Sequence, residues 1–274
     1  IYRKTTDLAK TCVNRIGSKQ EKIVSDDATF NRWFEKLVER HQRNLTFQEI
    51  RKALQALSSV YVQRRDKLKK GAALDSAGKR AAFAVFYGPL HYLFMKAVLE
   101  ELDSNPTSVK HIVDLGCGTG VGSAAWSALG GCKATVEGID LNKWATDECR
   151  LTYHAFGLKG QTRTGNLLGA KLPGAGGAVV AAYAINELSD GAREEMLQKL
   201  LKAGAQGAKV LIIEPIATTP VPWWQSWTAA FETQGGVSQT WKIPVDLPDH
   251  LRLLDKATRM NHQVLKGRSL WLNS

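Results

Sequence analysis

The chain has 274 residues, of which 44% are apolar, and it carries a formal net charge of +11. This length and apolar content predict a folded globule with a sizeable core, and no apolar run reaches the roughly 18 residues that a membrane-spanning helix needs. The four cysteines form neither a CxxC pair nor a zinc-binding spacing, so we expect reduced thiols, no metal and a cytoplasmic protein.

Nearly all of the excess positive charge lies in the first third of the chain. Residues 1–80 contain 19 Lys and Arg against 9 Asp and Glu, a net charge of +10, whereas residues 81–274 contain 18 against 17, a net charge of +1. A basic region attached to a neutral body indicates a polyanionic partner; a solvated helical face without a partner is the alternative. We therefore expect a helical, basic N-terminal extension over 1–80 and a second domain over 81–274.

The N-terminal extension has the apolar periodicity of helices. Aromatic and aliphatic residues recur every three or four positions over 29–44, with charged residues between them. A second helix starts at Thr46, where Glu49 completes a capping box, and it ends in the basic run 64-RRDKLKK-70. Both helices are amphipathic, so their apolar faces must pack against another part of the protein.

The rest of the chain has the pattern of an α/β domain. Residues 71–88 are expected to form a Gly/Ala-rich joint, and Pro89 suits the first turn of a helix that runs to about Leu102. From Val109 onward strands and helices alternate, which predicts a parallel sheet covered by helices on both faces. The expected strands cover 109–115, 134–140, 160–166, 178–184, 209–214 and 268–273, and the expected helices cover 121–129, 142–156, 189–203 and 220–234.

The most informative stretch is 111-HIVDLGCGTGVG-122, in which a strand runs into glycine at every second position. Strand, glycine turn and helix form the βα unit that binds nucleotide-like cofactors at the carboxyl edge of a sheet. A phosphate-binding P-loop is excluded, because no Lys-Ser or Lys-Thr pair follows the glycines. A dinucleotide site is a poor match, because Val121 stands where the third glycine of GxGxxG belongs.

The acids around this turn favour S-adenosylmethionine, which has a sulfonium, an ammonium group and two ribose hydroxyls but no phosphate. Asp114 in the first strand can face the cationic methionine end, and Asp140 at the end of the second strand can accept both ribose hydroxyls. Glycine lets the backbone approach the cofactor where a Cβ atom would collide. We therefore predict that Gly116, Gly118 and Gly120 bind the cofactor together with the two acids.

With 114-DLGCGTG-120 and a second-strand acid, the sequence resembles the class I S-adenosylmethionine-dependent methyltransferases from its first strand onward. The resemblance implies a Rossmann-like sheet, S-adenosylmethionine as cofactor, and contact between Leu141 and the adenine ring. It also implies that Asn166 binds the adenine amino group, although Asn166 is alternatively a plain turn residue. The segment before the first strand often covers the cofactor in this fold, so Tyr87 and His91 are expected to line the site unless they belong to the core.

The methyl-acceptor site of this fold lies at the end of the fourth strand, here 179-VVAAYAINELSD-190. The [DNS]-P-P-[YFW] motif of adenine amino-group methyltransferases is missing, no cysteine stands there for attack on a cytosine ring, and a Lys-Asp-Lys-Glu set cannot be assembled. The acceptor atom therefore stays open. By position, Glu187 is the candidate base and Asn186 a hydrogen-bonding positioner, while the alternative role for Glu187 is to cap the following helix.

Three features together resemble the small-ribosomal-subunit methyltransferase family, whose mitochondrial members act in ribosome assembly. They are the basic helical extension, the aromatic element 83-FAVFYGPLHY-92, and the strand ends 183-YAINEL-188 and 213-IEP-215. The resemblance implies structured RNA, most of all small-subunit ribosomal RNA or the subunit itself, as the partner of residues 1–80. Mitochondrial members carry cysteines suited to an iron–sulfur cluster, which this chain does not reproduce, so we expect no cluster and a bacterial-type form. A small-molecule methyltransferase and a non-catalytic assembly factor that keeps the cofactor fold are the alternatives.

Overall fold

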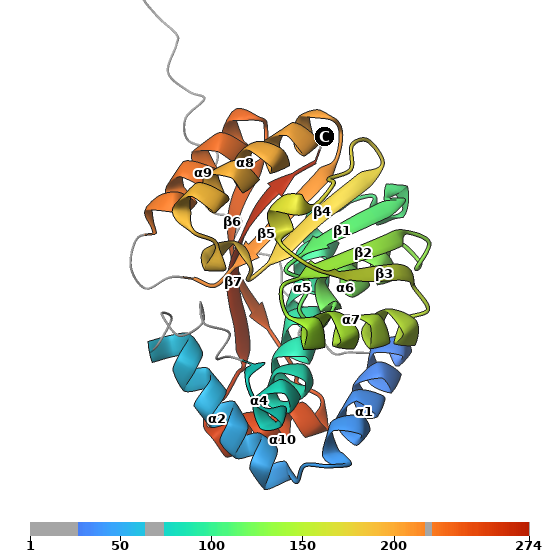
Figure 1. Ribbon diagram of the computed structural model, residues 1–274, viewed down its shortest axis with the longest axis vertical. Helices are drawn as coiled ribbons and strands as arrows, with labels where there is room; N and C mark the ends of the chain where they lie inside the picture. Colours follow the sequence, from blue (N-terminus) through green and yellow to red (C-terminus); the bar gives the residue numbers. More distant parts are fainter. Residues whose placement is uncertain (1–26, 64–73, 217–220, 274) are drawn as a thin grey trace, which may run out of the picture.

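The computed structural model describes residues 27–63, 74–216 and 221–273, which contain a seven-stranded sheet in the order β3-β2-β1-β4-β5-β7-β6 (Figure 1). The first five strands are parallel, so their carboxyl ends share one edge, and β7 runs antiparallel between β5 and β6. The strands are β1 (His111–Leu115), β2 (Thr135–Asp140), β3 (Lys159–Thr164), β4 (Gly177–Ala182), β5 (Lys209–Glu214), β6 (Val237–Pro244) and β7 (Val264–Leu272).

Helices cover both faces of the sheet, and successive strand residues pack into two separate cores. Ile112 of β1 belongs to the cluster that also holds α5, α6 and α7, whereas Val113 belongs to the cluster that holds α8 and α9, as the alternation of side chains along a strand requires. The α-helices are α1 (Ala28–Gln42), α2 (Phe47–Gln63), α4 (Ala77–Ala82), α5 (Gly88–Leu102), α6 (Val121–Leu129), α7 (Lys143–Ala155), α8 (Asp190–Ala205), α9 (Pro222–Thr233) and α10 (Asp249–Thr258). The other helical turns are the π-helix η2 (Phe83–Tyr87) and the 3-10 turns η3 (Pro106–Ser108), η4 (Leu167–Gly169) and η5 (Ile185–Glu187).

The Rossmann-like α/β fold predicted from the sequence is confirmed, and the elements from β1 to β5 end within two residues of their expected bounds. The expectation of a wholly parallel sheet is wrong for its last two strands. Neither β6 nor α10 was expected, and β7 begins four residues earlier than its expected start at 268. The edge strand β6 exposes most of its side chains, so it lacks the apolar alternation by which strands are recognised.

The expected joint over 71–88 is also wrong where the structure describes it, because α4, η2 and α5 form one helix from Ala77 to Leu102. The π-helical turn η2 ends two residues before Pro89 and accommodates a residue that otherwise interrupts a regular helix. This helix of 26 residues is long and apolar enough to cross a membrane by length and composition, but 78% of its most apolar window is buried inside the protein. The helix therefore belongs to the core of the domain.

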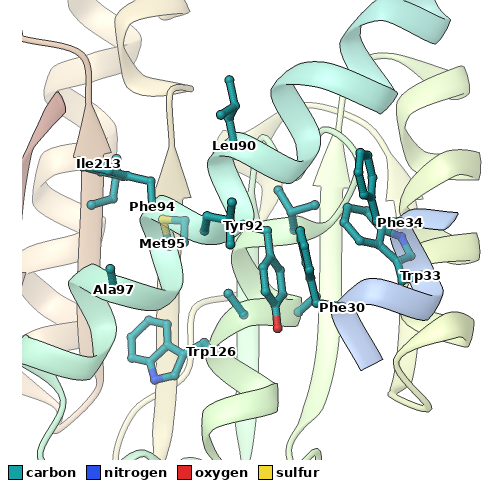
Figure 2. Close-up of a cluster of buried hydrophobic side chains, with 14 of the residues drawn as sticks. Phe30, Trp33, Phe34, Leu90, Tyr92, Phe94, Met95, Ala97, Trp126 and Ile213 are labelled. Carbon is teal, nitrogen blue, oxygen red and sulfur yellow. The ribbon is translucent and has the colours of Figure 1, made fainter. Parts of the chain in front are cut away.

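The two N-terminal helices belong to the same hydrophobic core as the sheet. Phe30 and Trp33 of α1 are buried against Tyr92 of α5, with ring centroids 4.8 and 6.1 Å from the tyrosine ring (Figure 2). Trp33 also contacts Phe156, which follows α7. The expected division at residue 80 therefore has no counterpart in the core of the described residues.

Polar contacts anchor α1 to the sheet side of the protein. Arg40 donates two hydrogen bonds to Glu148 of α7, which is 3% exposed. Burial alone would raise the pKa of Glu148, but hydrogen bonds from His41 and Arg40 hold this pKa below its usual range. The Tyr92 hydroxyl donates to Asp27 at 2.9 Å, and the same aspartate caps α1. The predicted capping box of α2 is confirmed, since Thr46 and Glu49 exchange backbone-to-side-chain hydrogen bonds.

Candidate functional site

The glycine turn between β1 and α6 is packed so closely that two of its glycines have no room for a side chain. Gly116 has a φ of 70°, and a Cβ atom there would lie 2.4 Å from the Cβ of Ala184 at the end of β4. Gly120 has a φ of 80°, and its Cβ would lie 2.7 Å from the sulfur of Cys149 in α7. The turn therefore packs directly against the loop after β4 and against the middle of α7. Close approach of the same glycines to a cofactor remains a proposal.

Asp114 lies beneath this turn and is 2% exposed. Its Oδ2 accepts hydrogen bonds from the backbone nitrogen and the hydroxyl of Ser123, at 3.0 and 2.7 Å, so it holds the first turn of α6. Burial raises the pKa of Asp114 to about 6, although the Ser123 hydrogen bonds oppose the shift and the nearby Asp140 adds to it. The expected contact with the methionine end of a cofactor remains a proposal, whereas the structure shows Asp114 as the support of the turn.

Asp140 connects the end of β2 to the glycine turn. Its two oxygens accept from the backbone nitrogens of Gly118 and Asn142, at 2.9 and 2.8 Å. Burial raises its pKa, and these backbone hydrogen bonds offset part of the effect. The next residue, Leu141, is 73% exposed, so its apolar side chain is accessible to an adenine ring.

Asn166 makes the turn interaction that is the alternative to cofactor binding. It is exposed after β3, and its Oδ1 accepts from the backbone nitrogen of Leu168 at 2.9 Å, which caps the 3-10 turn η4. Contact with an adenine amino group therefore remains a proposal for this residue.

The loop after β4 brings the two candidate acceptor-site residues to the same edge of the sheet. Tyr183 has a φ of 60°, a strained conformation of a kind found at functional sites, and Asn186 and Glu187 follow in the turn η5. The Glu187 side chain is exposed, but protein atoms near its carboxyl reduce its hydration, and this desolvation together with the charge of Asp140 raises its pKa to about 7. Ser189 caps α8 instead of Glu187, so the helix-cap alternative for Glu187 is wrong.

Two residues missed in the sequence hold this loop from opposite sides. Glu214, at the end of β5, is fully buried and accepts from the backbone nitrogen of Asn186 at 3.1 Å and from its side-chain amide. Arg193 of α8 donates to the carbonyl oxygens of Ile185 at 3.4 Å and Leu188 at 2.7 Å. The acid in 213-IEP-215, directly after an apolar strand, was the available signal for Glu214; no local pattern marked Arg193.

A row of aromatic side chains from η2, from the start of α5 and from the loop after β4 lies along the site. The His91 ring stacks on Tyr183, with centroids 4.1 Å apart, and Tyr87 follows at 6.0 Å from His91. Phe83, at the start of η2, comes within 3.7 Å of the position that a Cβ of Gly118 would take. Burial lowers the pKa of His91 to about 4, so its imidazole is neutral near pH 7. Tyr87 and His91 are thus placed beside the glycine turn and the acceptor loop.

The electrostatics of the site suit a cationic ligand. Asp114, Asp140 and Glu187 each have a raised pKa, and none of them forms an ion pair with a described residue. Carboxyls that are desolvated and not neutralised by the protein are stabilised by an external positive charge. The sulfonium and ammonium groups of S-adenosylmethionine supply this charge, so the residues present fit that cofactor.

Comparison with known proteins supports the same assignment. Residues 112–207 match the family described as Methyltransferase domain, while comparison with curated proteins gives no match. A proposed class I S-adenosylmethionine-dependent methyltransferase from Listeria monocytogenes has a similar structure, with a TM-score of 0.51 and 13% identity over 90% of this chain and 88% of that chain.

Two more distant structures belong to methyltransferases with different names. Magnesium protoporphyrin IX methyltransferase from Synechocystis, with bound S-adenosylmethionine, gives a TM-score of 0.46 and 14% identity over 84% of this chain and all of the other. A proposed RNA methyltransferase from Pyrococcus horikoshii gives 0.43 and 17% over 67% of this chain and 83% of that chain. Such distant similarity concerns the fold and carries no information on substrate. From the domain match, the strand order and the acidic glycine turn, we conclude that this chain carries a class I S-adenosylmethionine-dependent methyltransferase domain.

Proposed function

We propose that this protein transfers a methyl group from S-adenosylmethionine to structured RNA, and that small-subunit ribosomal RNA is its target. The observation that carries the proposal is the position of α1 and α2, the described helices of the basic N-terminal region. The helices α1 and α2 lie beyond the carboxyl ends of the parallel strands (Figure 1). A polyanion bound to this region would therefore be held at the mouth of the site.

The contacts of α2 make this placement specific. The hydroxyl of Tyr87, which lies beside the site, is hydrogen-bonded to Ser58 of α2. The basic run 64-RRDKLKK-70 directly follows α2 in the sequence and lies outside the described residues. Lysine and arginine side chains bind nucleic acid mainly through its phosphates, with affinity that falls steeply as salt is added.

Each residue of the site has a separate role in methyl transfer. S-adenosylmethionine supplies the activated methyl group when it is bound. Asp140 is placed to accept the ribose hydroxyls and Leu141 to cover the adenine, while Asp114 contributes negative charge beneath the cationic end. Glu187 is placed to take a proton from the acceptor. Alignment of the reacting groups and exclusion of water supply much of the rate enhancement in such a displacement.

Methyl-tritiated S-adenosylmethionine tests the proposal directly. The protein is incubated with small ribosomal subunits, with free small-subunit rRNA and with a cell extract depleted of macromolecules. Label in the rRNA or the subunits is the expected result. Label confined to the small-molecule fraction would instead make the protein a small-molecule methyltransferase, and no label, with cofactor binding intact, would favour a non-catalytic assembly factor.

The basic run provides a matched test of the RNA partner. Deletion of residues 1–70 is unsuitable, because it would remove α1 and α2 and uncover the core around Tyr92. The better variant replaces Arg64, Arg65, Lys67, Lys69 and Lys70 with glutamine. RNA affinity should fall, and the slope of log affinity against log salt should become less steep by roughly 0.7 to 0.9, the range for single-stranded and B-form nucleic acid, for each phosphate that the variant no longer neutralises. Cofactor affinity should stay unchanged.

A further inference from the structure

Glu214 determines which end of the Asn186 side-chain amide faces the acceptor site. Its buried carboxyl accepts hydrogen bonds from the backbone N–H groups of Ile185 and Asn186 and from Nδ2 of Asn186. Three N–H donors directed at one carboxyl require its oxygens to act as acceptors. The amide of Asn186 therefore presents its NH2 end to Glu214 and has its Oδ1 at the other end.

The Oδ1 of Asn186 is available to a substrate. It has no hydrogen-bond partner among the described residues, and the side chain is only half-buried. Glu187 follows directly and lies close enough to Asp140 for the two negative charges to interact. The cofactor edge thus offers two hydrogen-bond acceptors on consecutive residues, an amide oxygen and a carboxylate.

The loop that carries both acceptors is fixed on its other side by Arg193. The guanidinium donates to the carbonyls of Ile185 and Leu188, and its side chain is 12% exposed. The ring of Trp223 lies 5.0 Å from the guanidinium carbon. A carboxylate at the N–H groups and a guanidinium at the carbonyls together restrict the turn to one orientation.

We propose that the methyl acceptor is an uncharged amino nitrogen, which donates one N–H to Oδ1 of Asn186 and the other to Glu187, and that Glu214 is the positioning residue that sets this arrangement. An NH2 group matches two acceptors, whereas a hydroxyl has one proton to donate and a ring carbon has none. The inference rests on the methyl-transfer activity of the proposed function, and it holds for RNA and small-molecule acceptors alike.

The step is balanced without an additional reactant. The lone pair of the acceptor nitrogen forms a bond to the methyl carbon, the carbon–sulfur bond breaks, and its electron pair stays on sulfur as a neutral thioether. The positive charge passes from sulfur to nitrogen. One N–H proton then moves to Glu187 and from there to water, leaving a neutral methylated amine.

Exchanging the polarity of the buried pair tests the role of Glu214. Glu214→Gln and Asn186→Asp each remove the donor–acceptor pairing between the two side chains. Each should lower kcat by about 10- to 100-fold, with the KM for the cofactor nearly unchanged. In the double variant the new glutamine amide donates to the new aspartate, which still offers an oxygen to the acceptor, so kcat should recover most of the loss. Glu232→Gln, an exposed carboxylate on α9, is the matched control. A double variant no better than the worse single variant, with all proteins folded, would overturn the positioning role.

Two further measurements separate this inference from the proposed function. Mass spectrometry of the labelled product should find the methyl group on an amino nitrogen; a methyl on a hydroxyl oxygen or a ring carbon contradicts the inference.

If no acceptor takes up label, the proposed function fails, and nitrogen-15 NMR still tests the side-chain orientation. The Asn186 NH2 resonances, assigned by their loss in Asn186→Asp, should be shifted and protected from exchange in the parent and lose that protection in Glu214→Gln. A freely exchanging amide in the parent would refute the hydrogen bond.

Discussion

The two edges of the parallel sheet use acidic side chains in opposite ways. At the amino edge, Asp103 is 4% exposed and fully paired: Lys209 donates to it at 2.5 Å and the indole of Trp126 at 2.9 Å. At the carboxyl edge, Asp114 and Asp140 receive only backbone and hydroxyl donors, and their pKa values are raised. A paired acid stabilises the fold, whereas an acid without a cation retains its electrostatic potential for a ligand.

The largest predicted effect is on the free energy of unfolding, and it comes from a residue at the amino edge. Lys209→Met would leave the Asp103 carboxylate buried with only neutral donors, and breaking a buried ion pair typically costs about 3–5 kcal/mol. Urea unfolding should show a loss of this size, with cofactor affinity unchanged under conditions where the variant is folded. Lys202→Met on α8 provides a control at an exposed lysine. Equal unfolding midpoints for the two variants would show that the pair contributes nothing.

At the glycine turn, Gly116→Ala should act on both stability and binding. The residue has a positive φ, and the added methyl would meet Ala184 at 2.4 Å; strain in this region of backbone space costs about 1–3 kcal/mol before any collision is counted. Gly131→Ala is a matched control, because Gly131 has a φ of 73° and nothing within 4 Å of its Cβ position.

The two glycine variants therefore isolate the collision from the backbone strain. Calorimetry should show cofactor binding abolished in Gly116→Ala and retained in Gly131→Ala, although denaturation should show both proteins destabilised. Retention of cofactor binding in Gly116→Ala would contradict the close approach of the turn.

The parts of the molecule that were predicted correctly depend on local sequence. The run from β1 through the glycine turn to Asp140 combines an apolar strand, fixed glycine positions and a strand-end acid, and all of these are visible within a short window. Glu214 and Arg193 were missed because their role exists only when β5 and α8 pack beside the loop after β4. The pair of Asp103 and Lys209 joins residues 106 positions apart for the same reason.

The N-terminal helices show the same limit of prediction from local sequence. Their amphipathic periodicity predicted that they pack on something, but not that Arg40 would reach Glu148 across 108 positions. The sequence presented them as a basic extension, and the structure places them in the main core of the protein. Charge and periodicity describe a helix by itself, whereas its partner is decided by the tertiary fold.

A more moderate effect at the carboxyl edge is expected from Asp140→Asn. Replacing a carboxylate that binds ribose hydroxyls should weaken cofactor binding by about 1.5–3 kcal/mol, the range for hydrogen bonds to charged groups. Stability should change less than binding, because the neutral amide avoids the desolvation that raises the pKa of Asp140 but can accept from only one of the two backbone nitrogens. Isothermal calorimetry measures the affinity, with Asp147→Asn, at a side chain of α7 that is 42% exposed, as the control. Unchanged affinity would remove Asp140 from the cofactor site.

The smallest effect, of about tenfold or less, is the dependence of cofactor affinity on pH. The pKa of Asp114 is raised to about 6 and that of Glu187 to about 7, so in the free protein both carboxyls take up protons as pH falls through this range. A cationic ligand favours the ionised forms, and its binding therefore releases protons. Affinity for S-adenosylmethionine should accordingly rise between about pH 5.5 and 7.5 and level off above.

The product of the reaction provides the control, since S-adenosylhomocysteine keeps the ammonium group but has no sulfonium charge. Its affinity should rise less over the same pH range, and Glu187→Gln should remove the upper part of the rise for the cofactor, whereas Glu194→Gln on the exposed face of α8 should not. The raised pKa values also mean that the native state binds more protons than the unfolded chain, so these carboxyls should lower stability as pH rises from about 4 to about 7. If the affinities for cofactor and product rise equally with pH, the acids do not respond to the sulfonium charge. The carboxyl edge would then lose the electrostatic distinction from the amino edge that its desolvated acids indicate.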